Sequence, residues 1–249
     1  MAIEHDRRAW GELAELDPLW GALTTDARRA WSTSEFIGSG EEEIAGLLAH
    51  AVTLGYPAER ERALDFGCGP GRLTRALAQH FGSSVGVDLS PRMVEVAQRL
   101  HADVENCRFL TGERVLDGFG DAEFDLVYSN LVLQHVSDPS AVAEYVAGFA
   151  RVLRPGGLLA FQLLTELPVL RRVQPRRRLY EALRAAGVPP RTLFRRMRLD
   201  PIGLYAIDAT RVEATLTTAG AAVLRADEAL WPGRVRSTTY FATRPVQQG

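Results

Sequence analysis

Short runs of hydrophobic residues alternate with amphipathic stretches through the middle of the chain. Five such runs predict buried strands, at residues 62–66, 84–88, 107–111, 124–129 and 158–162. Between them, hydrophobic residues at three- and four-residue intervals predict helices at 71–80, 91–100 and 139–152, the second of them capped by Ser90. Strands that alternate with helices in this way are typical of a parallel sheet, so we expect an α/β fold.

The predicted strands end in residues with distinctive chemistry. Gly67, Asp88, Glu113 and Asn130 each fall at the carboxyl end of a strand or just after it. The carboxyl ends of parallel strands meet at one edge of a sheet, and α/β proteins bind ligands at that edge. We therefore expect these four residues to lie together in a ligand site.

The flanking segments have different patterns. Residues 3–31 predict helix, 34–40 a loop, and 41–54 a helix. The first turn of that last helix would hold Glu41, Glu42 and Glu43, which we interpret as acids that stabilise the positive end of the helix dipole. After the fifth strand, the pattern predicts a helix at 209–219, capped by Asp208, and strands at 222–227 and 236–243.

Residues 166–205 stand apart, because they hold ten arginines and five prolines and predict two or three short helices. We therefore divide the chain into three parts. Residues 1–38 form a helical cap, 39–165 together with 206–249 form the ligand-binding domain, and 166–205 form an arginine-rich lid inserted after the fifth strand. The cap carries three of the four tryptophans, and with the lid it is expected to cover the ligand site.

The turn after the first strand, Asp65-Phe66-Gly67-Cys68-Gly69-Pro70-Gly71, is the most informative motif. Glycines at alternate positions let a ligand approach the main chain closely. A dinucleotide fingerprint requires a glycine at the sixth place, which is Arg72 here. Asp65 beside the turn suits an ammonium group better than a pyrophosphate, and Asp88 follows at the distance expected of an acid that binds a ribose. This combination points to S-adenosylmethionine.

Composition narrows the alternatives. The chain has 249 residues, a net charge of −2 and 29 basic residues, all of them arginine, so a Schiff-base or P-loop lysine is excluded. No apolar stretch approaches the length of a membrane span, and the N-terminus lacks the zones of a signal peptide. Two cysteines, Cys68 and Cys107, give no metal-binding spacing and suit a reducing compartment. We expect a cytoplasmic protein with no metal and no membrane partner.

The combined motifs resemble the class I S-adenosylmethionine-dependent methyltransferases, specifically their bacterial small-molecule branch. The resemblance rests on residues 64–71, Gly86-Val87-Asp88-Leu89-Ser90, residues 124–130 and Arg151-Val152-Leu153-Arg154-Pro155-Gly156-Gly157. It implies a Rossmann-like, seven-stranded, mostly parallel sheet, whose last strand is antiparallel and inserted between strands five and six. It also implies S-adenosylmethionine as cofactor, with S-adenosylhomocysteine as the product.

The same resemblance assigns roles by position. Asp65, Gly67 and Gly69 would hold the methionine end of the cofactor, and Asp88 would accept hydrogen bonds from the ribose hydroxyls. Leu89 and Met93 would flank the adenine. Gly112, Glu113 and Arg114 would meet its edge, and the backbone of Asn130 would close the site.

For the methyl acceptor, His135 is the candidate base, because it follows the fourth strand and could titrate near neutrality. A histidine there could instead simply bond a backbone carbonyl. Gln134, Arg172 and Tyr205 are candidate substrate contacts, with the arginines of 166–205 either solvated or paired with an anionic acceptor.

We therefore expect methyl transfer to a small organic molecule, at oxygen in the first instance and otherwise at carbon or nitrogen, by a monomer or homodimer. Two alternatives stay open: an RNA methyltransferase that uses the arginines as a phosphate footprint, and a binding protein of this fold that transfers no methyl group. Nucleic acid is the disfavoured partner, because no groove-reading motif or aromatic interleaving accompanies the arginines.

Overall fold

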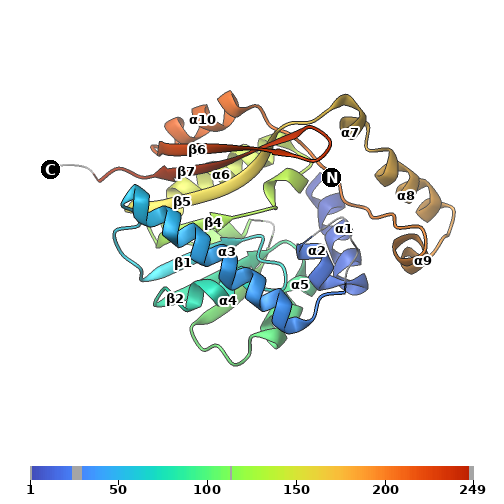
Figure 1. The fold of residues 1–249 in the computed structure, drawn as a ribbon, viewed down its shortest axis with the longest axis horizontal. Coiled ribbons are helices and arrows are strands. Elements are labelled where there is room, and N and C mark those ends of the chain that lie inside the picture. Colours follow the sequence, from blue (N-terminus) through green and yellow to red (C-terminus); the bar gives the residue numbers. More distant parts are fainter. Residues whose placement is uncertain (1, 24–29, 113, 247–249) are drawn as a thin grey trace.

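Seven strands form one sheet in the order β3-β2-β1-β4-β5-β7-β6. The computed structural model describes residues 2–23, 30–112 and 114–246, and Figure 1 shows their arrangement. The strands are β1 (Arg62–Phe66), β2 (Ser83–Asp88), β3 (Cys107–Thr111), β4 (Phe124–Ser129), β5 (Leu153–Glu166), β6 (Ala222–Trp231) and β7 (Val235–Thr243). The first five pair in parallel, whereas β7 lies antiparallel between β5 and β6. The predicted sheet is confirmed.

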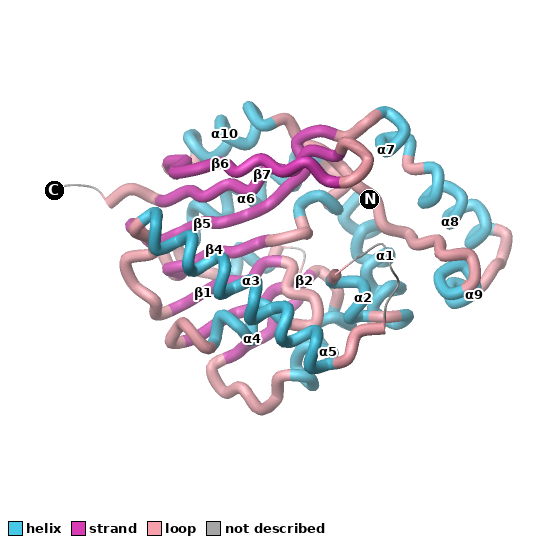
Figure 2. Tube along the Cα trace, in the orientation of Figure 1, coloured by secondary structure: helices cyan, strands magenta, loops and turns pink. Residues whose placement is uncertain are grey.

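Helices cover both faces of this sheet, which explains why its strands are hydrophobic almost throughout. Along β5, Leu158 and Ala160 pack with α3 (Thr33–Leu54) and α4 (Arg72–Ala78). The alternate residues Leu159 and Phe161 pack on the other face with α6 (Pro139–Val152) and α10 (Ala209–Thr218). Figure 2 shows α3 and α4 in front of the strands. The helix α5 (Pro91–Leu100) begins at the predicted Ser90 cap, whose hydroxyl accepts the Met93 N–H.

The helix α3 begins well before the predicted residue 41, so the expected loop at 34–40 is wrong. Ser32 and Glu35 form a capping box, in which the Ser32 hydroxyl accepts the Glu35 N–H and the Glu35 carboxylate accepts the Ser32 N–H. Gly40 then lies inside the helix, where a Cβ would be 2.5 Å from the Arg72 carbonyl oxygen. The glycine therefore allows α3 to pack directly on α4.

We expect Ser32→Ala to destabilise the protein by about 1 kcal/mol, because the first turn of α3 loses its N-cap acceptor. Urea unfolding of the two proteins measures the difference. Ser34→Ala is the matched control, because its hydroxyl contacts the Ser32 hydroxyl and caps no backbone N–H. Equal stabilities for Ser32→Ala and the unaltered chain would show that the capping box does not hold the helix start.

The insertion 166–205 folds into three short helices, as predicted: α7 (Val169–Val173), α8 (Pro175–Ala185) and α9 (Pro190–Arg195). It packs on the N-terminal helices α1 (Ala2–Leu16) and α2 (Pro18–Ala22). The Trp20 and Phe194 rings meet edge to face at 5.2 Å, and Arg184 Nε donates to Glu12 Oε1 at 3.0 Å. Figure 1 shows all five helices gathered at one end of the sheet.

No helix in the described part of the chain is both long enough and apolar enough to cross a membrane.

Candidate functional site

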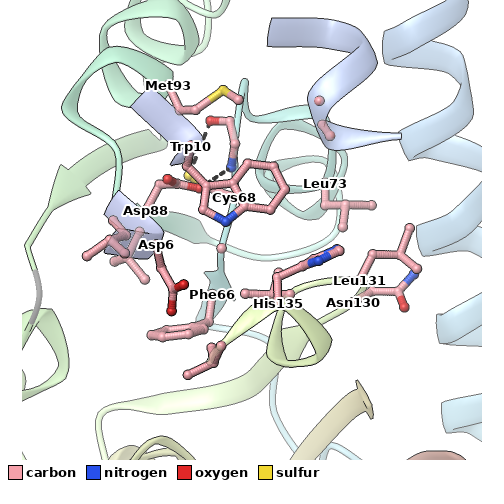
Figure 3. Close-up of a pocket in the computed structure, with 18 of the residues that line it drawn as sticks. Asp6, Trp10, Phe66, Cys68, Leu73, Asp88, Met93, Asn130, Leu131 and His135 are labelled. Carbon is pink, nitrogen blue, oxygen red and sulfur yellow. Dashed lines mark hydrogen bonds between the residues drawn. The ribbon is translucent and has the colours of Figure 1, made fainter. Parts of the chain in front are cut away.

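A cavity of about 110 Å³ opens at the carboxyl ends of β1, β2 and β4. It is lined by the β1–α4 turn, the end of β2, Gly112 after β3, the loop that follows β4, and residues of α1 and α2 (Figure 3). The predicted convergence at this edge of the sheet therefore holds for Gly67, Asp88 and Asn130. Glu113 lies outside the described residues.

Asp88, at the end of β2, faces this cavity as a half-buried carboxylate. Its Oδ2 accepts the Gly69 N–H and its Oδ1 accepts the Ser90 N–H, each at 2.8 Å. Burial raises the pKa of Asp88 to about 6, against the lowering effect of these two bonds. Each carboxylate oxygen keeps a further lone pair, so Asp88 can accept hydrogen bonds from two hydroxyl groups of a ligand.

The glycine turn brings bare backbone to the cavity. Gly67 has φ of +79°, and a Cβ there would lie 2.2 Å from Val132 Cγ2. Its N–H donates to the Val87 carbonyl at 2.8 Å, which ties the turn to the neighbouring strand β2. Only glycine satisfies both the backbone conformation and this close approach.

Asp65 does not reach the cavity, contrary to the role expected for it. Its side chain is 1% exposed, and its Oδ2 accepts the Thr74 hydroxyl at 2.7 Å. Burial raises its pKa to about 7. Side chains alternate along a strand, so the residue two positions before Gly67 points into the α3–α4 side of the sheet rather than toward the turn.

We expect Asp65→Asn to stabilise the protein at pH 8. The folded pKa of Asp65 lies above its unfolded value of 3.8, so its ionisation destabilises the fold progressively as the pH rises through about 7. Asparagine keeps the acceptor for Thr74 and removes that cost, which is on the order of a few kcal/mol. Urea unfolding at pH 5.5 and pH 8 should show a larger gain at pH 8. A loss of stability at pH 8 would contradict this account.

The other predicted cofactor residues divide between the cavity and the surface. Gly69, Leu89, Met93 and Gly112 line the cavity. Arg114 does not, because its side chain is 85% exposed and its Nε donates to Asp117 Oδ2 at 2.6 Å beside the short helix η1 (Val115–Gly118). The sequence gives position 114 relative to the strand end but not the direction of its long side chain.

The loop after β4 presents His135 to the cavity. The chain turns sharply at Leu131, whose φ is +61° and whose N–H donates to Gln162 Oε1 at 3.2 Å. The short helix η2 (Leu133–His135) follows. His135 Nδ1 lies 2.8 Å from the Gly203 carbonyl oxygen, and the ring meets Trp10 edge to face at 5.2 Å. A carbonyl only accepts, so Nδ1 carries the proton and Nε2 keeps its lone pair.

Burial lowers the pKa of His135 to about 4, and the Gly203 bond only partly offsets this effect. The expectation that His135 titrates near neutrality is therefore wrong, because the cap and the insertion enclose the ring. At pH 7 His135 is a neutral imidazole whose Nε2 lone pair accepts a hydrogen bond from Gln134 Nε2 at 3.2 Å.

The three expected substrate contacts lie outside the cavity lining. Gln134 is buried, and its backbone carbonyl accepts the Tyr205 N–H at 2.8 Å. The Tyr205 hydroxyl accepts a hydrogen bond from Arg177. Arg172 is exposed, and its Nε donates to the Leu167 carbonyl at 2.8 Å. These side chains stabilise the insertion and its contact with η2.

Sequence reasoning missed three charged residues at or beside the cavity. Asp6 of α1 lines it and accepts the Ser137 N–H and hydroxyl, at 3.0 and 2.9 Å. Arg72 lines it from the start of α4. Glu43 lies beside Arg72 in the middle of α3, so the interpretation of this acid as a helix-dipole partner is wrong. The position of Arg72 straight after the glycine turn was the one available signal. Trp10 of α1 also lines the cavity.

In the described ranges, no group of three or more His, Cys, Asp or Glu residues is arranged to hold a metal ion. The polar residues that line the cavity include Asp6, Arg72, Asp88, Asn130 and the neutral His135, together with the glycine-rich backbone turn.

Comparison with known proteins finds methyltransferases that match the central part of the chain. A family model described as "Methyltransferase domain" matches residues 64–161. A ubiquinone biosynthesis O-methyltransferase of Cereibacter sphaeroides is 33% identical over 129 residues, which is 51% of each chain. A trans-aconitate 2-methyltransferase of Methylobacterium radiotolerans is 35% identical over 138 residues, covering 53% of this chain and 47% of that one. The matches thus span about half the length of these relatives.

The magnesium protoporphyrin IX methyltransferase of Synechocystis, solved with bound S-adenosylmethionine, has a similar fold. The comparison gives a TM-score of 0.62 at 18% identity and covers 98% of this chain and 97% of the other. Residues 64–161, which the family model matches, hold the glycine turn, β2 with Asp88, and the β4 loop. These elements line the cavity on the side of the sheet. Over residues 64–161 the chain is thus similar to the methyltransferase-domain family, and its fold is shared with a methyltransferase solved with bound S-adenosylmethionine.

Proposed function

We propose that this protein transfers a methyl group from S-adenosylmethionine to a small organic acceptor. The observation that carries the proposal is the placement of Asp88 and the bare turn at Gly67 and Gly69 around one cavity. When bound, S-adenosylmethionine supplies a methyl group activated by a sulfonium. Asp88 would hold its ribose, the Gly67–Gly69 backbone its methionine portion, and Leu89 and Met93 its adenine.

The protein's own residues then orient the acceptor and receive its proton. Displacement at a sulfonium needs chiefly positioning and the exclusion of water. The cap would help to position the acceptor and to exclude water, because Trp10 and Gly21 line the cavity together with the residues of the sheet edge. His135 would take a proton on Nε2 once an acceptor hydroxyl replaces the Gln134 amide there, since its Nδ1–H is fixed on Gly203. A hydroxyl acceptor must lose its proton on methylation, and this arrangement provides a group that can receive it.

The cap and the insertion would act as one cover over the site. Arg184 of α8 and Phe194 of α9 contact Glu12 and Trp20 of the cap, which links the two segments. The ten arginines of 166–205 lie outside the lining of the cavity, so they offer the acceptor no direct anion contact in this state of the protein. The curated relatives act on chemically different molecules, and the acceptor of this protein is to be found by assay.

Calorimetric titration with S-adenosylmethionine, followed by mass spectrometry across a panel of acceptors, tests the proposal. We expect one cofactor site per chain and a product that gains one methylene. Cofactor that returns unchanged from every reaction would indicate a binding protein of this fold. Copurified RNA, together with a steep loss of activity as salt increases, would indicate an RNA substrate instead.

A further inference from the structure

Arg72 is a buried cation at the edge of the proposed cofactor site. It follows the glycine turn directly, lines the cavity, and has a side chain that is only 5% exposed. A guanidinium removed from water in this way must be paired or hydrogen-bonded. Its Nη2 donates to Glu43 Oε2 at 2.7 Å, and its Nη1 donates to the Ser39 carbonyl at 3.3 Å.

The helix α3 fixes this cation. Gly40 lets α3 lie against the Arg72 backbone, and Glu43 follows one turn later on the same helix. The other oxygen of Glu43, Oε1, accepts the Asn130 amide at 2.7 Å and the Tyr128 hydroxyl at 2.9 Å. Glu43 thus joins Arg72 to Asn130, and both of these residues line the cavity. This network connects α3, α4 and the end of β4.

The guanidinium retains donors for a ligand. Arginine has five N–H groups in a planar fork, and two of them account for the bonds to Glu43 and Ser39. Guanidinium forks match carboxylates well, and arginine stays charged at every relevant pH. Asp65, expected at the methionine end, is enclosed behind the turn. The charged residue that follows the turn directly and lines the cavity is Arg72.

We propose that Arg72 binds the α-carboxylate of the cofactor's methionine end, and that Glu43 is a positioning residue that holds Arg72 and Asn130 in place. This inference rests on the proposed function, because it assigns a contact within the same cofactor site. It gives the amino-acid portion of the cofactor a recognition group of its own, separate from the ribose contact at Asp88.

Two nucleosides test it without any turnover. S-adenosylhomocysteine carries the amino-acid end, whereas 5′-methylthioadenosine has the same adenosine and thioether but lacks that end. We expect Arg72→Met, which keeps the length and apolar stem of the side chain, to weaken S-adenosylhomocysteine binding by about 10- to 100-fold. Methylthioadenosine affinity should change by less than about threefold. Calorimetry measures both.

Glu43→Gln should weaken S-adenosylhomocysteine binding selectively as well, because Arg72 loses its anchor. Arg72→Met leaves the Glu43 carboxylate without its ion-pair partner, which could unfold the protein. In that case the double variant Arg72→Met/Glu43→Gln, which removes this charge, replaces it in the binding measurement. Arg75→Met on the same helix is the matched control, since Arg75 pairs with the exposed Asp103 outside the cavity. Arg75→Met should bind S-adenosylhomocysteine and methylthioadenosine as tightly as the unaltered chain does.

Equal losses for the two nucleosides in Arg72→Met would overturn the inference, because they would show that Arg72 only supports the turn. Unaltered S-adenosylhomocysteine binding in the folded variant would overturn it as well. If the unaltered chain binds neither nucleoside, the proposed function itself fails. A selective loss of S-adenosylhomocysteine binding in Arg72→Met supports both the inference about Arg72 and the proposed function.

Discussion

Replacing Asp88 by alanine is expected to weaken S-adenosylmethionine binding by about 100- to 1000-fold. A hydrogen bond to a charged group contributes about 1.5–3 kcal/mol, and the substitution removes the acceptor for both ribose hydroxyls. It also removes the hydrogen-bond acceptor of the Gly69 and Ser90 N–H groups, each of which donates to the carboxylate at 2.8 Å. Calorimetric titration gives the dissociation constant directly.

The matched control for this prediction is Asp103→Asn, at an exposed acid that pairs with Arg75 away from the cavity. Its cofactor affinity should equal that of the unaltered chain. The cofactor affinity of Asp88→Asn should lie between those of Asp88→Ala and the unaltered chain, because its amide oxygen can still accept a hydrogen bond. Tight binding by a folded Asp88→Ala protein would remove Asp88 from the site and with it the main support for the proposed function.

The affinity should also depend on pH with a definite sign. The pKa of Asp88 is raised to about 6, so the carboxylate is ionised above that value and becomes protonated below it. Cofactor affinity is therefore expected to be level above pH 7 and to fall as the pH decreases through about 6. In Asp88→Asn this dependence should disappear.

Removing the imidazole of His135 is expected to lower kcat by about 100-fold or more and to leave cofactor affinity unchanged. General base catalysis contributes factors of this size, and the proton acceptor Nε2 is lost in His135→Ala. The pKa of about 4 means that His135 stays neutral from pH 5 upward, so it should cause no acid limb of kcat near neutrality. Initial rates with the identified acceptor, measured between pH 5.5 and 8, check both statements.

His135→Asn separates catalysis from positioning. The asparagine amide nitrogen lies at about the place of Nδ1 and can donate to the Gly203 carbonyl, but it offers nothing at the place of Nε2. A base at Nε2 predicts that His135→Asn is as slow as His135→Ala. Full turnover by His135→Asn would mean that the histidine only links η2 to the insertion.

Much of the architecture follows from local pattern. The hydrophobic runs predicted β1 to β4 within about one residue and placed β5, because strands buried on both faces must be apolar almost throughout. Ser90 and Asp208 marked the starts of α5 and α10 through the capping geometry of their own side chains. Gly67 and Asp88 could be assigned to one site because each lies at the carboxyl end of a strand, and the carboxyl ends of parallel strands meet at one edge of the sheet. The comparisons agree with the family assigned on these motifs.

The tertiary structure decided which side chains reach the cavity. Asp65 is buried on the α3–α4 side of the sheet and does not reach the cavity. The packing of α3 on α4 places Glu43 beside Arg72, with which it forms an ion pair. Packing of the cap on the insertion brought in Asp6 and Trp10 and left Arg172 outside. The physical reason is distance along the chain. Periodicity and caps report on residues within a few positions of one another, whereas these contacts join segments whose relative placement depends on the whole packed core.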